Sequence, residues 1–331
     1  MQACWRNRGD EILTEKILIV DGLNTFLRNW MVVPSMNTNG EPVGGIVGFI
    51  RTLKKMIREN NPSRVVVVWD GVGGSQKRRG VYSEYKDGRK PRANRTYDFE
   101  SPEASQRNLF WQGDKVKQII GILGVNFIEI PAIEADDVIA YLARWMYDGA
   151  EKVIVSTDKD FLQLVDGKTS VYSASKDITW TPFNLKEKLN ILPENFILMK
   201  CLMGDGSDNI DGVKGFGEKT VVKLFPFLSE RPTSLNEIID HASLNITKGT
   251  KYKSVVEDKE KLSMNYQLMQ LSSPTMSAQA SAHIRSSLDN SKRVLNLTEF
   301  KLLLIREGLS LEDKDLMSVF TQFGVRMRNA A

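Results

Sequence analysis

The chain has 331 residues, of which 41% are hydrophobic and 26% are charged, so it is long and apolar enough to bury one large core or two unequal ones. Its 45 Lys and Arg residues against 41 Asp and Glu residues leave a formal net charge of +4, a weak indication of a polyanionic partner. This composition excludes global disorder, a membrane span of about 20 apolar residues and a secretory signal, and we expect a soluble protein of the cytoplasm.

Short apolar runs alternate with helical patterns through the first half of the chain, an order that predicts an α/β fold with a mostly parallel central sheet flanked by helices. The segment 71–107 is long, basic and poor in aliphatic residues, and it interrupts this order. After about residue 192 the pattern becomes helical. In chain order, we expect strands at 17–20, 65–69, 125–130, 153–155 and 170–172, helices at 46–57, 138–146, 193–203, 295–305 and 311–323, and a linker or loose helix at 272–287.

These elements predict three parts of the chain. Residues 1–15 form an N-terminal extension, and residues 16–192 form the α/β core, which contains the basic segment at about 71–107. Residues 193–331 form a smaller helical domain with further helices at its C-terminal end.

Acidic residues follow three of the predicted strands. Asp21 comes after ILIV, Asp70 after VVVVW, and Asp158 and Asp160 after VIVST. The carboxyl ends of parallel strands lie at one edge of a sheet, so these acids are expected at one place. Taken singly, an Asp at this position is more often a turn residue or a helix cap than a ligand, but the same pattern on three strands favours a common site.

Two further acidic groups lie on other segments: Glu134, Asp136 and Asp137 stand in IEADDV, and Asp205 and Asp208 stand in MGDGSDNI. A helix N-terminus favours an acid, but three packed carboxylates without a cation would repel one another. Because two Cys and two His residues cannot make a zinc site, a hard divalent ion held by oxygens is the simplest compensation. The nine carboxylates suit two Mg²⁺ or Mn²⁺ ions, which stabilise the attacking and leaving oxygens in phosphodiester hydrolysis.

The motifs ILIVDG, VVVVWDG, YKDGRKPR, IEADDVIA, STDKDFLQLV and MGDGSDNIDGVKGFGEKT, in this order, resemble the five-prime nuclease (flap endonuclease) family. That family includes the nuclease domain of bacterial DNA polymerase I and stand-alone nucleases of bacteriophages, one of which is called RNase H because it removes RNA primers. The resemblance covers about residues 16–228 and implies a PIN-like nuclease core and a helical domain with a helix-hairpin-helix-like DNA-binding element. Because no polymerase-like sequence follows, the chain is more similar to the stand-alone phage type, which would work in the host cytoplasm.

The resemblance also implies how the acids divide between two metal ions. Some bacterial relatives lack part of the second set, whereas this chain has all of it, which favours an active enzyme over a degenerate binding protein. The first set is Asp21, Asp70, Glu134 and Asp136, with Asp137 close by, and the second set is Asp158, Asp160, Asp205 and Asp208.

Eight basic residues lie between Lys77 and Arg95, a run that is typical of a solvated loop. Interleaved tyrosines favour a second interpretation, in which aromatic rings stack on the bases of a single strand and cations bind its phosphates. In the family, the corresponding segment is an arch over the active site, and the resemblance implies that Lys86 and Arg89 contact the phosphate near the scissile bond, with Arg28 as a secondary candidate. Other DNA contacts of the arch are expected from Lys77, Arg78, Arg79, Tyr82, Tyr85 and Arg92.

The glycines Gly215 and Gly217 stand in GFGEKT, which does not fit a dinucleotide-binding loop because no third glycine and no preceding strand are present. A plain turn is one interpretation. The other is a helix-hairpin-helix-like element, in which glycine lets backbone N–H groups approach the phosphates of a duplex. Lys214, Lys219 and Lys223 would supply positive charge, and members of the family often bind a potassium ion at this hairpin.

We therefore expect a metal-dependent five-prime nuclease, with exonuclease and flap endonuclease action, that serves DNA replication and RNA primer removal. Its expected substrates are flap, nicked or gapped duplex DNA and RNA/DNA hybrid. We expect a monomer without membrane association, with a single-strand binding protein or a clamp as candidate partners. Two alternatives are a non-catalytic junction DNA-binding protein, which the nine intact acids argue against, and a phosphatase with a DxD loop, which fits poorly because Gly22 and Leu23 follow Asp21.

Overall fold

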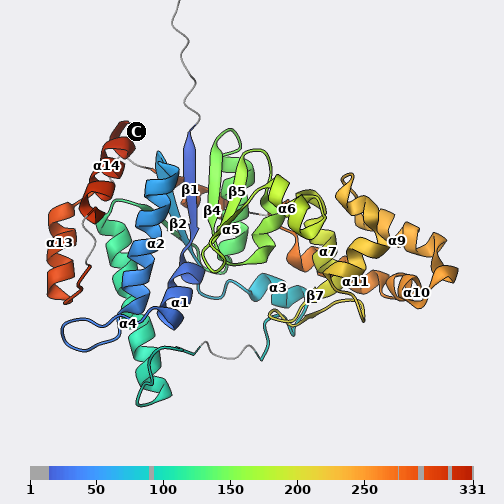
Figure 1. Ribbon diagram of the computed structural model, residues 1–331, viewed down its shortest axis with the longest axis horizontal. Helices are drawn as coiled ribbons and strands as arrows, with labels where there is room; N and C mark the ends of the chain where they lie inside the picture. Colours follow the sequence, from blue (N-terminus) through green and yellow to red (C-terminus); the bar gives the residue numbers. More distant parts are fainter. Residues whose placement is uncertain (1–14, 89–92, 275, 290–293, 312–314, 330–331) are drawn as a thin grey trace, which may run out of the picture.

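A six-stranded sheet crosses the middle of the computed structural model, which describes residues 15–329 apart from 89–92, 275, 290–293 and 312–314 (Figure 1). The strand order is β3-β2-β1-β4-β5-β6, the first five strands run parallel, and β6 is antiparallel to β5. The predicted fold class and the five predicted strands are thus confirmed. The strands are β1 (Lys16–Asp21), β2 (Arg64–Trp69), β3 (Asn126–Glu129), β4 (Glu151–Val155), β5 (Thr169–Ser173) and β6 (Ile178–Trp180).

The central strand β1 is buried on both faces of the sheet. Leu18 and Val20 pack into one core, whereas Ile17 and Ile19 pack into the core on the other face. Such a strand forms an unbroken apolar run, which is why ILIV is visible in the sequence. In the register of the sheet, Val20 lies opposite both Val67 of β2 and Val155 of β4, so these three strands end at the same level.

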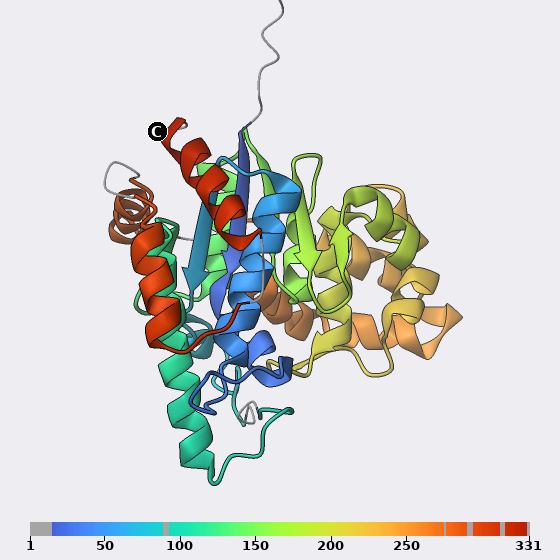
Figure 2. The same ribbon diagram turned by 60° about the vertical axis from the view of Figure 1, so that its left-hand side comes forward.

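Among the described residues, five helices cover one face of the sheet, in two layers (Figure 2). The helix Gly44–Asn60 next to the sheet is buried along the apolar face that the sequence predicts at 46–57, and its C-cap residue Asn61 adopts the left-handed conformation with φ 49°. The outer layer packs on this helix and on the helix Pro102–Ile122, which extends the core beyond the sheet. The inner helices are α1 (Gly22–Val32), α2 (Gly44–Asn60) and α4 (Pro102–Ile122), and the outer ones are α13 (Leu297–Arg306) and α14 (Leu316–Asn329).

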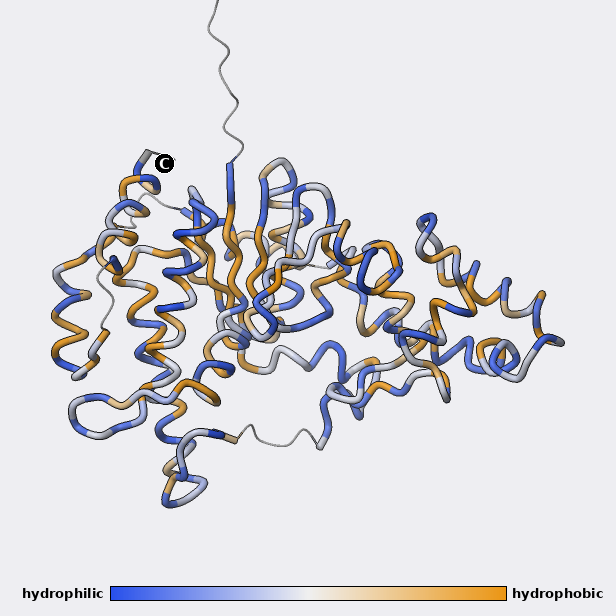
Figure 3. Tube along the Cα trace, viewed as in Figure 1, coloured by the Kyte–Doolittle hydropathy of each residue, from blue (hydrophilic) through white to orange (hydrophobic). Residues whose placement is uncertain are grey.

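The other face carries α5, and the helical part of the chain continues the same core to the side of the sheet (Figure 1). Apolar and polar residues alternate along its helices (Figure 3). This part returns to the sheet at its end, because the side-chain amide of Asn126 in β3 donates to the carbonyl of Ser287 at 2.9 Å. Its elements are α5 (Ala135–Tyr141), the π-helical turn Leu142–Met146, α6 (Pro182–Leu189), α7 (Phe196–Met203), β7 (Gly204–Asp205), β8 (Ile210–Asp211), α8 (Glu218–Leu224), α9 (Leu235–Leu244), α10 (Thr250–Glu257), α11 (Lys259–Met269) and α12 (Ala278–Ser287).

The structure corrects several sequence predictions. The basic segment contains the helix α3 (Gln76–Val81) and the start of α4, which the sequence analysis did not predict. The amides of Asn108 and Gln112 are buried in α4, where Gln112 donates to Asn108 at 2.7 Å, so polar residues interrupt its apolar face. The 272–287 segment contains the regular helix α12, which begins after Ser277, and the antiparallel strand β6 was missed because it has three residues.

Within the described part of the chain, no helix has both the length and the apolar character that a membrane crossing requires.

The outer helices are expected to unfold together with the sheet, because they share one buried core. Phe320 of α14 is fully buried, so Phe320→Ala should lower the free energy of unfolding by about 3–5 kcal/mol. Ile305 at the end of α13 is 76% exposed, so Ile305→Ala should change it by less than about 0.5 kcal/mol. Urea unfolding followed by circular dichroism measures both, and a similar change in the two variants would contradict the shared core.

Candidate functional site

Two of the predicted acids are fixed at the carboxyl ends of β1 and β2. Asp21 ends β1 and caps α1, accepting from the backbone N–H of Asn24 at 3.2 Å and from the hydroxyl of Ser156 at 2.8 Å. Asp70 follows β2 and accepts from the backbone N–H of Ala135 at 3.0 Å. Asp21 therefore also serves as a helix cap, the role weighed against a ligand role in the sequence, whereas Asp70 accepts from the first residue of α5 without being its cap residue.

The acids after β4 lie in the same place. Asp158 caps the 3₁₀ turn Lys159–Leu164, where it accepts from the backbone N–H of Asp160 at 2.9 Å. Burial raises the pKa of Asp21 to about 7, and the negative charges of Asp70 and Asp158 contribute to this shift. The three strand ends thus bring their carboxylates together, as their common position in the sequence predicts.

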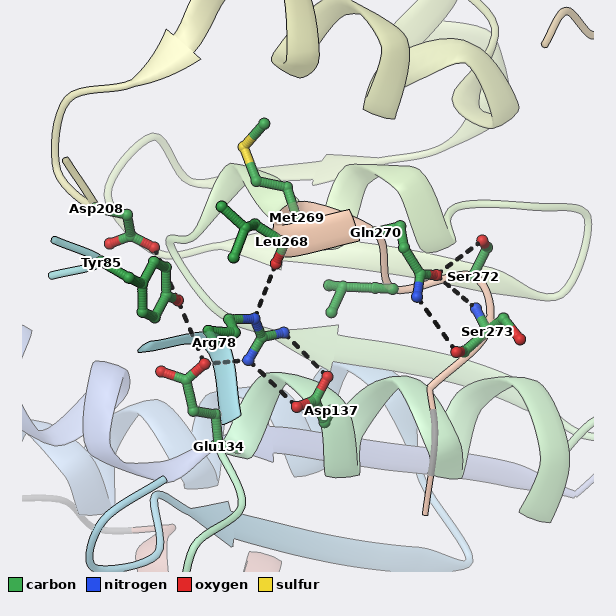
Figure 4. A network of polar contacts seen from close by, with 12 residues as sticks. Arg78, Tyr85, Glu134, Asp137, Asp208, Leu268, Met269, Gln270, Ser272 and Ser273 are labelled. Atoms are coloured by element: carbon green, nitrogen blue, oxygen red, sulfur yellow. Dashed lines mark hydrogen bonds and ion pairs between the residues drawn. The ribbon is translucent and has the colours of Figure 1, made fainter. Parts of the chain in front are cut away.

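Two acids at the start of α5, Glu134 and Asp137, are paired with the cation Arg78 of α3 (Figure 4). Arg78 donates to Glu134 and binds Asp137 with two nitrogens, at 3.0 and 3.2 Å. It also donates to the carbonyl of Leu268 in α11 at 2.8 Å. The side chain of Arg78 is only 11% exposed and is engaged by the acids, which corrects the prediction that it contacts DNA.

Tyr85 and Lys86 connect the basic segment 71–107 with two of the acidic groups. The hydroxyl of Tyr85 lies 3.3 Å from Glu134 and 3.2 Å from Asp208, and the ammonium group of Lys86 donates to Glu134. Lys86 adopts φ 56°, a left-handed conformation rare for lysine, and its backbone N–H donates to the carbonyl of Asp208 at 3.0 Å. The ring of Tyr85 is 2% exposed, which corrects the prediction that it offers a surface for stacking on bases.

Asp160 and Asp205 share a cation that the sequence analysis did not identify. Lys200 of α7 is buried, with its ammonium group 2.7 Å from Asp160 and in direct contact with Asp205. Asp205 also accepts from the backbone N–H and the hydroxyl of Ser207, at 2.8 and 2.7 Å. Lys200 stands five residues before Asp205 in MKCLMGD, where nothing in a single sequence separates it from a surface lysine.

The acids carry more negative charge than their cations balance. Burial and the charges of neighbouring acids raise the pKa of Asp136 well above its usual value and that of Asp160 to about 6. By contrast, the pKa of Glu134 is lowered, because Arg78 and Lys86 outweigh the effect of its burial. A divalent cation would remove the remaining repulsion, and the all-oxygen donor set has the chemistry that Mg²⁺ or Mn²⁺ requires.

Within the described residues, no group of three or more Asp, Glu, His and Cys side chains is arranged so that it could hold a metal ion. Instead, the cations Arg78, Lys86 and Lys200 lie among the acids. The donor set therefore fits a divalent ion in chemistry, but these cations or the acids must shift before an ion can be ligated.

The other predicted DNA contacts are placed as follows. Lys77 and Arg79 of α3 are exposed, and Tyr82 is half-buried, whereas Arg89 and Arg92 lie outside the described residues. Arg28 of α1 donates to the carbonyl of Ala174 at 2.9 Å, at a small cavity lined also by Ser156 and Thr157.

The glycine hairpin precedes α8. Gly215 adopts φ 79°, where a side chain would be strained, and Gly217 is the N-cap residue of α8. The three lysines expected to supply charge, Lys214, Lys219 and Lys223, are all exposed.

A separate cavity of about 880 Å³ lies between the connection of α1 to α2 and the start of α4. Its lining includes Trp111 and Tyr97, but also Glu41, Asp98 and Glu100 against the single cation Arg107. This excess of carboxylates disfavours DNA phosphates, so the cavity is not part of the candidate site.

Comparison with known proteins identifies the family. Residues 16–190 match the family model described as 5'-3' exonuclease, N-terminal resolvase-like domain, and residues 191–291 match the model of the C-terminal SAM fold of the same exonucleases. The chain therefore belongs to the 5'-3' exonuclease family, which confirms the resemblance found in the sequence.

The chain is 35% identical over 250 residues to DNA polymerase I of Bacillus subtilis (strain 168), covering 74% of this chain and 26% of the polymerase. It thus spans about a quarter of the length of that relative. It is 34% identical over 227 residues to the 5'-3' exonuclease of Buchnera aphidicola subsp. Schizaphis graminum, covering 67% of this chain and 74% of that protein.

Among solved structures, the fold is similar to that of the flap endonuclease of bacteriophage T5 in a pseudo-enzyme-product complex with DNA and metal ions. The TM-score is 0.64 at 20% sequence identity, and the match covers 93% of this chain and 100% of the T5 chain. This likeness is one of fold.

The buried ammonium group of Lys200 is expected to compete with divalent ions for Asp160 and Asp205. Lys200→Met should lower the free energy of unfolding without divalent ions by about 3–5 kcal/mol, because two buried carboxylates lose their shared cation. Mg²⁺ should then stabilise the variant more than the wild type, because both acids are open to the ion. Urea unfolding with and without Mg²⁺ measures the difference.

Lys159→Met is the matched control, because Lys159 forms an exposed ion pair with Glu218 at 3.2 Å. Its effect should stay below about 1 kcal/mol and be independent of Mg²⁺. An equal response of Lys200→Met and wild type to Mg²⁺ would show that Lys200 does not occupy an ion site.

Proposed function

We propose that the chain is a metal-dependent five-prime nuclease, with exonuclease and flap endonuclease action, that hydrolyses phosphodiester bonds at junctions of single-stranded and duplex DNA. One observation carries this proposal: nine acids from five segments are linked into one centre beside the arch. Asp136, Asp160 and Asp208, which come from three of these segments, line the same small cavity together with Arg78 and Tyr85. A protein that only binds DNA has no need for such a concentration of negative charge next to a phosphate backbone.

Two Mg²⁺ or Mn²⁺ ions are proposed to be held by the two sets of acids, Asp21, Asp70, Glu134 and Asp136, with Asp137 close by, and Asp158, Asp160, Asp205 and Asp208. Such ions, when bound, stabilise the attacking and leaving oxygens of a phosphodiester. The chain itself orients the acids: Ser156 and Asn24 hold Asp21, and the N-terminus of α5 holds Asp70. These hydrogen bonds reduce the reorganisation that the centre needs before reaction.

The arch is proposed to bind the strand that is cut. Lys86 is close to the acids, so its ammonium group would contact the phosphate near the scissile bond once Glu134 is engaged elsewhere. Arg89 is proposed for the same role, and Arg28, Lys77 and Arg79 for further phosphate contacts. Tyr82, which is half-buried, is the candidate for stacking on a base.

The glycine hairpin is proposed to bind the duplex side of the junction. The positive φ of Gly215 gives a tight turn without a side chain, so backbone N–H groups can approach phosphates. The exposed Lys214, Lys219 and Lys223 add charge without reading bases.

The proposed substrates are flap, nicked or gapped duplex DNA and RNA annealed to DNA, and the proposed setting is replication in the cytoplasm. A monomer that cooperates with a single-strand binding protein or a clamp is in keeping with this role. The alternative is a junction DNA-binding protein without catalysis. End-labelled flap, nicked and RNA/DNA substrates, incubated with and without Mg²⁺, separate the two, because only a nuclease gives metal-dependent products of defined polarity.

Asp136→Asn should reduce the single-turnover cleavage rate by about a hundredfold or more, because it removes a charge that the metal needs. Flap affinity should stay within a few-fold of the wild type, since the proposed DNA contacts are cationic. Asp98→Asn, an exposed acid in the separate cavity, is the control and should leave both unchanged. Cleavage by Asp136→Asn at the wild-type rate in limiting Mg²⁺ would refute the metal assignment.

Lys86→Ala should lower the single-turnover rate far more than it weakens binding, because its charge is most useful when the phosphate becomes more negative in the transition state. Lys77→Ala, on the exposed side of α3, should instead weaken binding and reduce the salt slope of log K by about 1. Rapid-quench cleavage and fluorescence anisotropy measure the two effects. A loss of binding alone in Lys86→Ala would make it an ordinary phosphate contact.

A further inference from the structure

One lysine outside the acidic centre, Lys251, forms a hydrogen bond with the glycine hairpin. The ammonium group of Lys251, in the first turn of α10, donates to the carbonyl of Gly215 at 2.6 Å and lies 3.4 Å from the hydroxyl of Thr220. The same group lies 5.4 Å from the centroid of the Phe216 ring. One cation is therefore surrounded by a carbonyl oxygen, a hydroxyl oxygen and an aromatic face, all from residues 215–220.

Two other carbonyls of the turn are used by the backbone. The carbonyl of Val213 accepts from Phe216 at 3.1 Å, and the carbonyl of Gly217 accepts from Thr220 at 2.9 Å and from Val221 at 3.0 Å. The Gly215 carbonyl points instead to Lys251. Lys251 thus adds a charged hydrogen bond to those that hold this conformation.

The position of Lys251 in its own helix indicates that this contact matters. A cation near a helix N-terminus is unfavourable, because the macrodipole is positive there. The neighbouring Tyr252 reaches the other end of α8, with its hydroxyl 3.5 Å from the carbonyl of Leu224. Lys251 and Tyr252 of α10 therefore contact the two ends of α8, the helix that follows the hairpin.

The potassium ion that the family resemblance implies at this hairpin would have to share two oxygens of residues 215–220 with Lys251. A monovalent cation would need oxygen ligands from the turn, and the Gly215 carbonyl and the Thr220 hydroxyl face Lys251. We propose that Lys251 is the built-in cation of the hairpin: its ammonium group takes the place of a bound monovalent ion and keeps residues 213–217 in the duplex-binding conformation. Lys251 is thus a positioning residue, and its role rests on the proposed duplex binding.

The test measures how duplex affinity depends on the identity of the monovalent cation. Wild type should bind a labelled nicked duplex equally, within about twofold, in KCl, NaCl and LiCl at one ionic strength, because its cation is covalently attached. Lys251→Met should bind about tenfold more weakly in LiCl, because the Gly215 carbonyl loses its charged donor, and should regain affinity in KCl. Anisotropy with Ca²⁺ in place of Mg²⁺ keeps the substrate intact.

Two further variants make the result specific. Lys253→Met on the same helix is the matched control, since its side chain is 62% exposed and pairs with Glu257; any loss of affinity there should be the same in all three salts. Lys251→Arg retains the charge and the donors and should retain the independence from K⁺. Thermal unfolding gives a second measurement, in which KCl should raise the Tm of Lys251→Met more than that of the wild type.

The outcomes separate this proposal from the proposed function. Tighter binding of the wild type in KCl than in LiCl would show an exchangeable ion at the hairpin and overturn the role of Lys251. An equal loss for Lys251→Met in all salts would make it an ordinary phosphate contact and would also overturn it. Absence of duplex binding by the wild type in every salt would refute the proposed function, and the role of Lys251 with it.

Discussion

The repulsion between carboxylates that the sheet brings together is the constraint on which the rest of the structure depends. Asp21, Asp70 and Asp158 follow adjacent parallel strands, and the register of the sheet holds these strand ends side by side. Burial increases the cost of the negative charge on Asp21, because the interior screens charges less than water does. A fold with this arrangement has to bring positive charge to the same edge, whether from its own side chains or from bound ions.

The chain meets this requirement with cations from distant segments, and these cations also join its parts. Arg78 of α3 binds acids of the α5 N-terminus and the last turn of α11, so one guanidinium links the arch, the core and the helical part. Lys200 does the same between α7 and the acid that follows β4. The same contacts therefore both balance the charged centre and hold the helical part against the core.

The fold was predictable where burial on both sides of a strand gives an unbroken apolar run, as in β1 and β2, and the acids were predictable because they follow those runs. The helix α4 was not, because its buried amides Asn108 and Gln112 disguise the apolar face. The partners of Arg78, Tyr85 and Lys200 could not be predicted either, since each pairs with residues at least five and up to 190 positions away. A single sequence records which residues are charged, but their pairing is decided by tertiary packing.

This pairing divides the basic residues into two populations with different responses to solvent. Exposed lysines such as Lys77 and Lys219 are surrounded by water, where salt screens their charge over a Debye length of about 10 Å at 0.1 M. Arg78 and Lys200 are largely buried and in contact with carboxylates, so salt screens them much less. Added salt therefore weakens the electrostatic interactions of the exposed lysines, while the contacts of Arg78 and Lys200 with carboxylates persist. The two populations consist of the same residue types, and each cation contributes equally to the net charge.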